Sequence, residues 1–131
     1  MISEIKTLFY NILANELEYN VTDNPYNNEE KIFPYVFLTL QDTRRAKLKN
    51  SYLFAIKFKI DIFSSYNGEK EILDMEQAIF EKSDELYENE FVSYLEETGF
   101  RIIDDKSTGV VRKHGIITYT IYSTGGIEDN E

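Results

Sequence analysis

The sequence predicts an α+β domain in which helices pack on one face of a largely antiparallel sheet of about four strands, in the order α-β-β-α-β-β. Three observations lead to this prediction. Apolar residues recur at helical spacing near the N-terminus and again in the middle of the chain. Residues 52–62 alternate between apolar and mostly charged side chains, as a half-buried strand does. The length of 131 residues suits one domain, which we expect to span residues 1–131.

The first third of the chain predicts a helix, a loop and a strand. Residues 2–17 carry apolar side chains three and four positions apart, so we expect an amphipathic helix there. Residues 22–30 are polar and contain Asn24-Pro25, which marks a loop. Pro34 then precedes the aromatic and β-branched residues 35–40, where a proline is tolerated at the entry to a strand.

Residues 52–62 give the clearest strand signal. Their even positions are all apolar, whereas Lys57, Lys59 and Asp61 occupy odd positions. The preceding strand is therefore expected to pair with them in an antiparallel hairpin. Residues 41–51 would form a long basic loop at the tip of this hairpin.

The second half of the chain predicts a helix over residues 69–87 and two closing strands. The inward stripe of the helix is expected to contain Ile72, Met75, Ile79, Phe80, Ser83 and Leu86. A short helix over residues 90–97 would end at Gly99 as its cap. Strands are expected over residues 100–104 and 110–122, with Gly115 at a bulge, followed by an acidic flexible tail over residues 123–131.

Composition argues against most enzyme classes. The chain has no cysteine and one histidine, which excludes a disulfide framework, a thiol nucleophile and a two-histidine metal site within one chain. It contains no glycine-rich phosphate loop and no serine nucleophile elbow. We therefore expect no catalytic residues, no cofactor and no metal; carboxylates holding a divalent ion are the remaining enzymatic alternative. His114, between Lys113 and Gly115, is expected to be a partly exposed strand residue.

Charge is distributed unevenly around a net charge of −10. Residues 44–59 contain six basic residues and no acidic one, whereas residues 69–97 contain eleven acidic and two basic residues. These regions are candidate interaction surfaces, with solvated faces as the alternative. The basic candidates are Arg44, Arg45, Lys47 and Lys49, and the acidic candidates are Glu76, Glu81, Asp84 and Glu85.

Several short motifs occur in an order that resembles a known family. They are Pro34-Tyr35-Val36-Phe37-Leu38, Lys59-Ile60-Asp61-Ile62-Phe63, Gly99-Phe100-Arg101 and His114-Gly115-Ile116. Together with the order of elements, they resemble the tail-completion proteins of long-tailed bacteriophages, the tail terminator or tail-to-head joining group. The resemblance covers roughly residues 2–122.

This resemblance implies a non-enzymatic virion protein that forms a ring, usually a hexamer, on the end of the tail tube. Its partners would be further copies of itself, the tail-tube protein and the head connector. DNA would pass through the ring without specific binding, and no membrane would be involved. The protein would be made in the bacterial cytoplasm and end in the virion. The alternative from a different class is a small cytoplasmic adaptor or assembly chaperone with an acidic interaction face.

Overall fold

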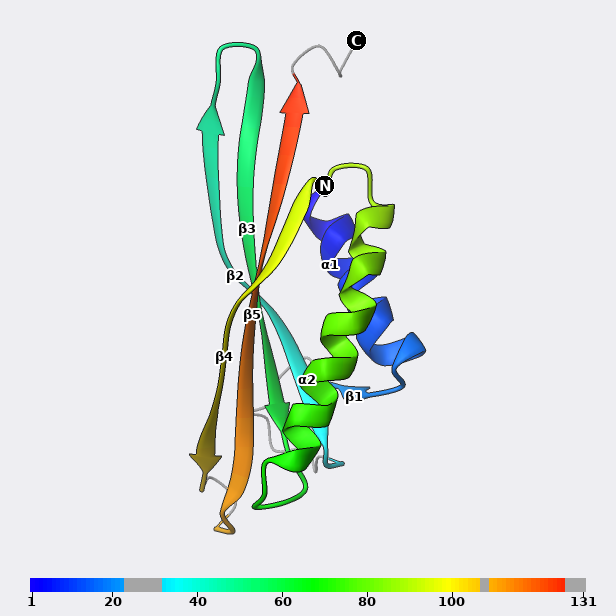
Figure 1. Cartoon of the computed structure of the whole chain (residues 1–131), viewed down its shortest axis with the longest axis vertical. Helices are drawn as coiled ribbons and strands as arrows, with labels where there is room; N and C mark the ends of the chain where they lie inside the picture. The colour runs from blue at the N-terminus through cyan, green and yellow to red at the C-terminus, as the bar shows by residue number, and fades with distance from the viewer. Residues whose placement is uncertain (23–31, 107–108, 127–131) are drawn as a thin grey trace.

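The computed structural model, described here for residues 1–22, 32–106 and 109–126, has an α+β fold in which two helices pack on one face of a mixed sheet (Figure 1). Within these ranges the sheet has five strands, in the order β1-β2-β3-β5-β4. The elements are α1 (Ile2–Asn11), a π-helical turn (Ile12–Glu16), β1 (Asn20–Val21), β2 (Tyr35–Lys47), β3 (Ser51–Phe63), α2 (Lys70–Lys82), a 3-10 segment (Ser83–Glu88), β4 (Tyr94–Asp105) and β5 (Arg112–Gly126).

Two antiparallel hairpins make up most of the sheet, as predicted. β2 pairs with β3, β4 pairs with β5, and β3 and β5 join the hairpins through a third antiparallel ladder. The additional strand is β1, which was not predicted and pairs in parallel with the start of β2 through Asn20 and Val21. A strand of two residues is too short to show alternation, so the predicted count of about four strands was one too low.

Two strands are longer than predicted at the end of the sheet where β3 begins. β2 continues to Lys47, which lies opposite Tyr52, so the expected long loop is reduced to a turn at residues 48–50. β5 continues to Gly126, opposite Ser51, so residues 123–126 belong to the sheet and not to a tail. The remainder of the predicted tail, residues 127–131, and residues 23–30 of the predicted loop lie outside the described part of the chain.

Two predictions around glycines were wrong. Residues 90–97 do not form a helix, because β4 begins at Tyr94, and Gly99 follows a bulge inside this strand. Gly115 lies in regular register opposite Ile62 and marks no bulge. A Cβ atom on Gly115 would lie 2.5 Å from Cγ2 of Ile72, so the glycine is needed for α2 to approach the sheet.

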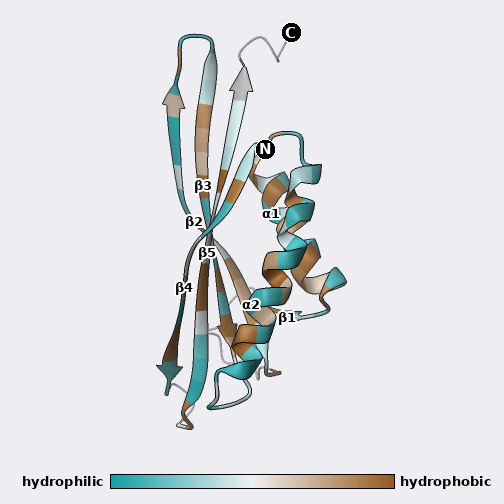
Figure 2. Cartoon of the chain, viewed as in Figure 1, coloured by the Kyte–Doolittle hydropathy of each residue, from teal (hydrophilic) through white to brown (hydrophobic). Residues whose placement is uncertain are grey.

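The core lies between the helices and one face of the sheet, which we call the helix-side face (Figure 2). β3 contributes Ile56, Phe58, Ile60 and Ile62 to it, all fully buried, as the alternation predicted. Phe9 of α1 packs edge-on against Phe58 and Tyr119, with ring centroids 6.0 and 5.5 Å apart. The predicted inward stripe of α2 is confirmed except for Phe80, which is 50% exposed because it lies at the edge of the stripe.

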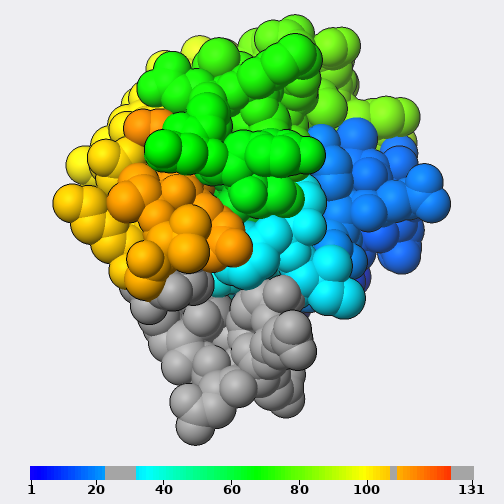
Figure 3. Space-filling model, turned by 90° about the horizontal axis from the view of Figure 1, so that it is seen from below, coloured from blue at the N-terminus to red at the C-terminus, as the bar shows by residue number. Residues whose placement is uncertain are grey.

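The starts of β2, α2 and β5 meet at one end of the molecule (Figure 3). At this end aromatic rings join β2, the end of β3 and β5. The rings of Tyr35 and Phe63 are stacked with centroids 4.6 Å apart, and the His114 ring stacks on Phe63 at 4.2 Å. Main-chain hydrogen bonds from Ser64 to Lys113 and from Lys113 to Tyr66 extend the contact into the connection before α2. This end is therefore closely packed.

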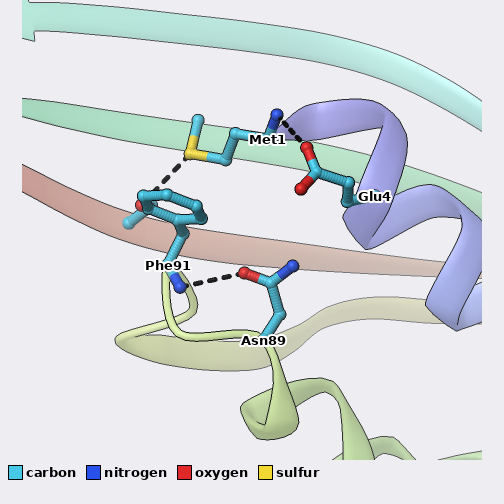
Figure 4. Close-up of polar contacts among 5 residues, drawn as sticks. Met1, Glu4, Asn89 and Phe91 are labelled. Carbon is cyan, nitrogen blue, oxygen red and sulfur yellow. Dashed lines mark hydrogen bonds and ion pairs between the residues drawn. The ribbon is translucent and has the colours of Figure 1, made fainter. Parts of the chain in front are cut away.

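At the opposite end, the β2–β3 hairpin projects beyond the helices (Figure 1). Met1 marks the limit of the helix layer: its ammonium group lies 2.6 Å from Glu4, and its sulfur accepts a hydrogen bond from Ser123 Oγ at 3.4 Å (Figure 4). Ser123 lies opposite Phe54, which in turn lies opposite Arg45. We call residues 44–54 the arm: it comprises this row, the part of the hairpin beyond it, and Arg44, which directly precedes the row.

Candidate functional site

The predicted basic residues all belong to the arm, but they do not form one surface. Arg44, Arg45 and Lys47 lie on β2, and Lys49 lies in the turn. Because side chains alternate along a strand, Arg44 faces away from the helices, whereas Arg45 and Lys47 share the helix-side face. The sequence analysis grouped all four on a loop, so it had no means of separating them by face.

Arg44 lines a shallow hollow on the helix-free face of the sheet, with a volume of about 250 Å³. Lys57 lines the same hollow from β3, and Thr120 and Tyr122 line it from β5. Asp42 contributes one carboxylate, so the hollow has a mixed but mainly basic lining.

The helix-side face of the arm combines basic and aromatic side chains. The guanidinium carbon of Arg45 lies 5.4 Å from the centroid of the Phe54 ring, within the range of a cation–π interaction. The rings of Tyr52 and Phe54 follow each other on this face, with centroids 6.0 Å apart. Lys47 lies opposite Tyr52, as Arg45 lies opposite Phe54. Each of these two cross-strand pairs therefore combines a cation with an aromatic ring.

The predicted acidic residues divide into three environments. Glu81 and Asp84 are exposed at the end of α2 and in the 3-10 segment that follows. Glu85 is half-buried and its carboxylate lies 3.4 Å from Lys82 Nζ, which also contacts Glu16 at 3.6 Å. Glu76 is also half-buried. Only Glu81 and Asp84 of the four therefore remain available to a partner.

Glu76 faces Glu97 of β4 and forms with it a pair of neighbouring carboxyl groups. Burial, and next the hydrogen bond and negative charge of Glu76, raise the pKa of Glu97 to about 7. The Tyr119 hydroxyl donates a hydrogen bond to Glu97 Oε1 at 3.4 Å, which acts in the opposite direction. Burial, followed by the charges of Glu97 and Glu76, raises the pKa of Tyr119. This group of three links α2 to the β4–β5 hairpin.

His114 has a carboxylate partner that the sequence analysis did not find. Its Nε2 atom lies 2.8 Å from Oδ1 of Asp61, and Lys59 lies 3.6 Å from the other carboxylate oxygen. Asp61 is 4% exposed, so the pair is held within the sheet. The alternation of residues 52–62 did place Asp61 off the core face, but the pairing of β3 with β5 was needed to bring the two residues together. The pair ties these strands to each other.

No group of three or more histidine, aspartate and glutamate residues in the described ranges is placed to hold a metal ion. Among the helices described, none has both the length and the apolar character needed to span a bilayer.

Comparison with known proteins does not indicate a function. The chain matches no protein-family model, and a search of curated proteins found no match. The function must therefore be argued from the surfaces themselves.

Proposed function

We propose that this protein is a non-enzymatic structural protein of a phage virion, forming an oligomeric ring that terminates the tail tube and joins it to the head connector. The observation that carries the proposal is the separation of charge: a basic arm at one place and exposed acids of α2 at another. A ring of identical subunits needs two different and complementary surfaces on each copy. The arm and the end of α2 meet this requirement.

The partners follow from the same proposal. Each copy contacts two further copies, a hexamer being the expected ring, and the ring contacts the tail-tube protein on one side and the head connector on the other. The net charge of −10 favours passage of DNA through the ring without specific binding, because acidic walls repel phosphates. The protein acts in the virion at the head–tail junction after synthesis in the host cytoplasm.

Charge reversal in the arm tests the proposal. The double variant Arg44→Glu/Arg45→Glu is expected to lose ring formation or docking to tail tubes. Light scattering after size exclusion measures the absolute mass, alone and after mixing with purified tail tubes, and electron microscopy scores capped tubes. The double variant Lys6→Glu/Lys70→Glu makes the same change in charge on the two helices and is expected to assemble. Full assembly of the arm variant would overturn the assignment of the arm.

The alternative is a small adaptor or assembly chaperone that binds a basic partner through exposed acids. Glu81 and Asp84 are the residues that favour it, because both are exposed; Glu81 Oε1 also accepts a hydrogen bond from Gln77 Nε2 on the same helix at 3.4 Å. The two functions differ in stoichiometry. A defined one-to-one complex with a basic partner, together with a monomeric protein that leaves tail tubes uncapped, would support the adaptor.

A further inference from the structure

Exposed apolar side chains occur on a flank of α2 and in the 3-10 segment after it. Leu73, Phe80 and Tyr87 are 47%, 50% and 44% exposed and follow one another at intervals of seven residues. Seven residues are close to two turns of an α-helix, so Leu73 and Phe80 lie along one side of α2. Tyr87 belongs to the 3-10 segment that follows, where three residues make a turn, so it is offset from this line. We call the three residues the α2 stripe. Exposed apolar side chains grouped on one element are candidates for a contact surface.

Acidic residues border the α2 stripe at the end nearer the arm. Glu81 and Asp84 are exposed there, between Phe80 and Tyr87 in the chain. The Tyr87 hydroxyl accepts a hydrogen bond from the Leu95 main-chain N–H at 3.0 Å, which holds this ring in place. The α2 stripe is thus a surface of exposed apolar side chains bordered by the carboxylates of Glu81 and Asp84.

The helix-side face of the arm has the matching composition. Tyr52 and Phe54 provide rings, and Arg45 and Lys47 provide the opposite charge on the same two rows. Because the helix layer stops at Met1, the described helices do not cover the outer row of this face (Figure 1).

The arm and the α2 stripe of one copy cannot meet each other. The arm continues the sheet, and β5 pairs with β3 as far as Ser51, which keeps the arm in line with the strands. Leu73 and Phe80 lie on a flank of α2, beside the face that buries Ile72, Met75 and Ile79, and Tyr87 reaches the edge strand β4. A contact between these surfaces therefore requires two molecules.

We propose that the arm of one copy lies on the α2 stripe of the next, with Tyr52 and Phe54 against Phe80 and Tyr87. In this contact Arg45 and Lys47 lie beside Glu81 and Asp84. The inference rests on the proposed function, for which it names the surfaces that join neighbouring subunits. It leaves Arg44, Glu76 and Glu85 outside the contact.

Engineered cysteines test this contact directly, because the chain has no cysteine of its own. Full-length Tyr52→Cys and Phe80→Cys are mixed and oxidised, alone and in the presence of tail tubes, and the disulfides are identified by peptide mass spectrometry. We expect the mixed 52–80 disulfide to exceed both symmetric disulfides. The matched control is Tyr10→Cys on α1, an aromatic position that is 43% exposed. A 52–80 yield no higher than the 52–10 yield, with or without tubes, would overturn the proposal.

A second variant measures the apolar part of the contact. Phe80→Ser is expected to weaken self-association, or association with tube-bound copies, by about tenfold or more, as for a ring at the centre of an interface. Its thermal unfolding should change little, since half of the ring is already exposed. Tyr10→Ser is the control and should associate as the wild-type protein does. Unchanged association of Phe80→Ser would contradict the proposal.

The contact and the proposed function fail in different ways. Capped tubes or a ring without the 52–80 disulfide would mean that the ring uses other surfaces. A 52–80 disulfide in a protein that leaves tail tubes uncapped would mean that the contact serves another assembly.

Discussion

At the scale of single residues, Glu97 makes the folded protein sensitive to pH. Its pKa is raised from 4.5 to about 7 in the fold, by burial first and by Glu76 next. The folded state therefore holds this proton more tightly than the unfolded chain does. The associated stability is fully present below about pH 4.5 and is lost as pH rises through 7.

Glu97→Gln should remove this dependence, because an amide remains neutral at every pH. We expect the variant to be more stable than the wild-type protein at pH 8 and to differ little from it at pH 5. Urea unfolding at intervals between these values measures the difference in free energy of unfolding. Glu81→Gln, at an exposed position, should show no such trend. A difference between Glu97→Gln and the wild-type protein that stays constant with pH would contradict this assignment.

Residues also show where sequence reasoning succeeds and where it stops. Alternation placed Ile56, Phe58 and Ile60 in the core correctly, because period two depends only on neighbours in the chain. The contact of His114 with Asp61 spans 53 residues and depends on which strands pair, which no local pattern contains. Phe80 was assigned inward because it follows the apolar spacing of the helix, and its exposure became visible only once α2 was packed.

At the scale of elements, the hairpins were predictable and their limits were not. The predicted loop at residues 41–51 is polar, but β3 offers a partner along its whole length and the ladder continues to Lys47. Tertiary pairing thus overrides the local signal for a loop. The predicted helix at 90–97 failed for the same reason, since Tyr94 and Leu95 pair with Tyr122 and Ile121. The acidic candidates shared a helix, but only packing revealed that Glu76 and Glu85 turn inward.

Removal of most of the arm should separate folding from assembly. Arg45 and Phe54 lie opposite each other, so replacing residues 46–53 with Asn-Gly leaves a two-residue turn of a type that hairpins favour. The thermal unfolding temperature should change little, because the deleted rows lie beyond the helix layer. The variant should fail to form the ring or to dock on tail tubes, as measured by light scattering and microscopy.

A control keeps this result interpretable. A full-length arm in which the turn residues 48–50 are replaced by three residues of neutral turn sequence should still assemble, since Tyr52, Phe54, Arg45 and Lys47 remain. Assembly of the shortened variant would show that the arm is not an interface. A large loss of thermal stability on shortening would show that the arm belongs to the folding core.

At the scale of the whole molecule, two electrostatic effects oppose each other. Every copy carries a net charge of −10, so copies repel at long range, whereas the proposed contact between the arm and the end of α2 would attract at short range. The Debye length is roughly 30 Å at 0.01 M salt and about 8 Å at 0.15 M. At low salt the net repulsion between copies therefore acts over the width of a molecule. At physiological salt only charged groups in contact with each other interact strongly.

The association rate should consequently pass through a maximum as salt is raised. From about 0.01 M to about 0.1 M, screening removes the long-range repulsion and the rate rises. Above that range, salt also screens the charge pairs between the arm and α2, so the association rate falls. The dissociation rate changes less, because the aromatic side chains in the contact oppose dissociation. Stopped-flow light scattering across the series measures both rates. Arg45→Gln/Lys47→Gln should retain the rise and lose the later fall, and Phe80→Ser should mainly speed dissociation. A rate that only rises with salt in the wild-type protein would mean that net repulsion dominates at every distance and that the arm contributes no charge pairing.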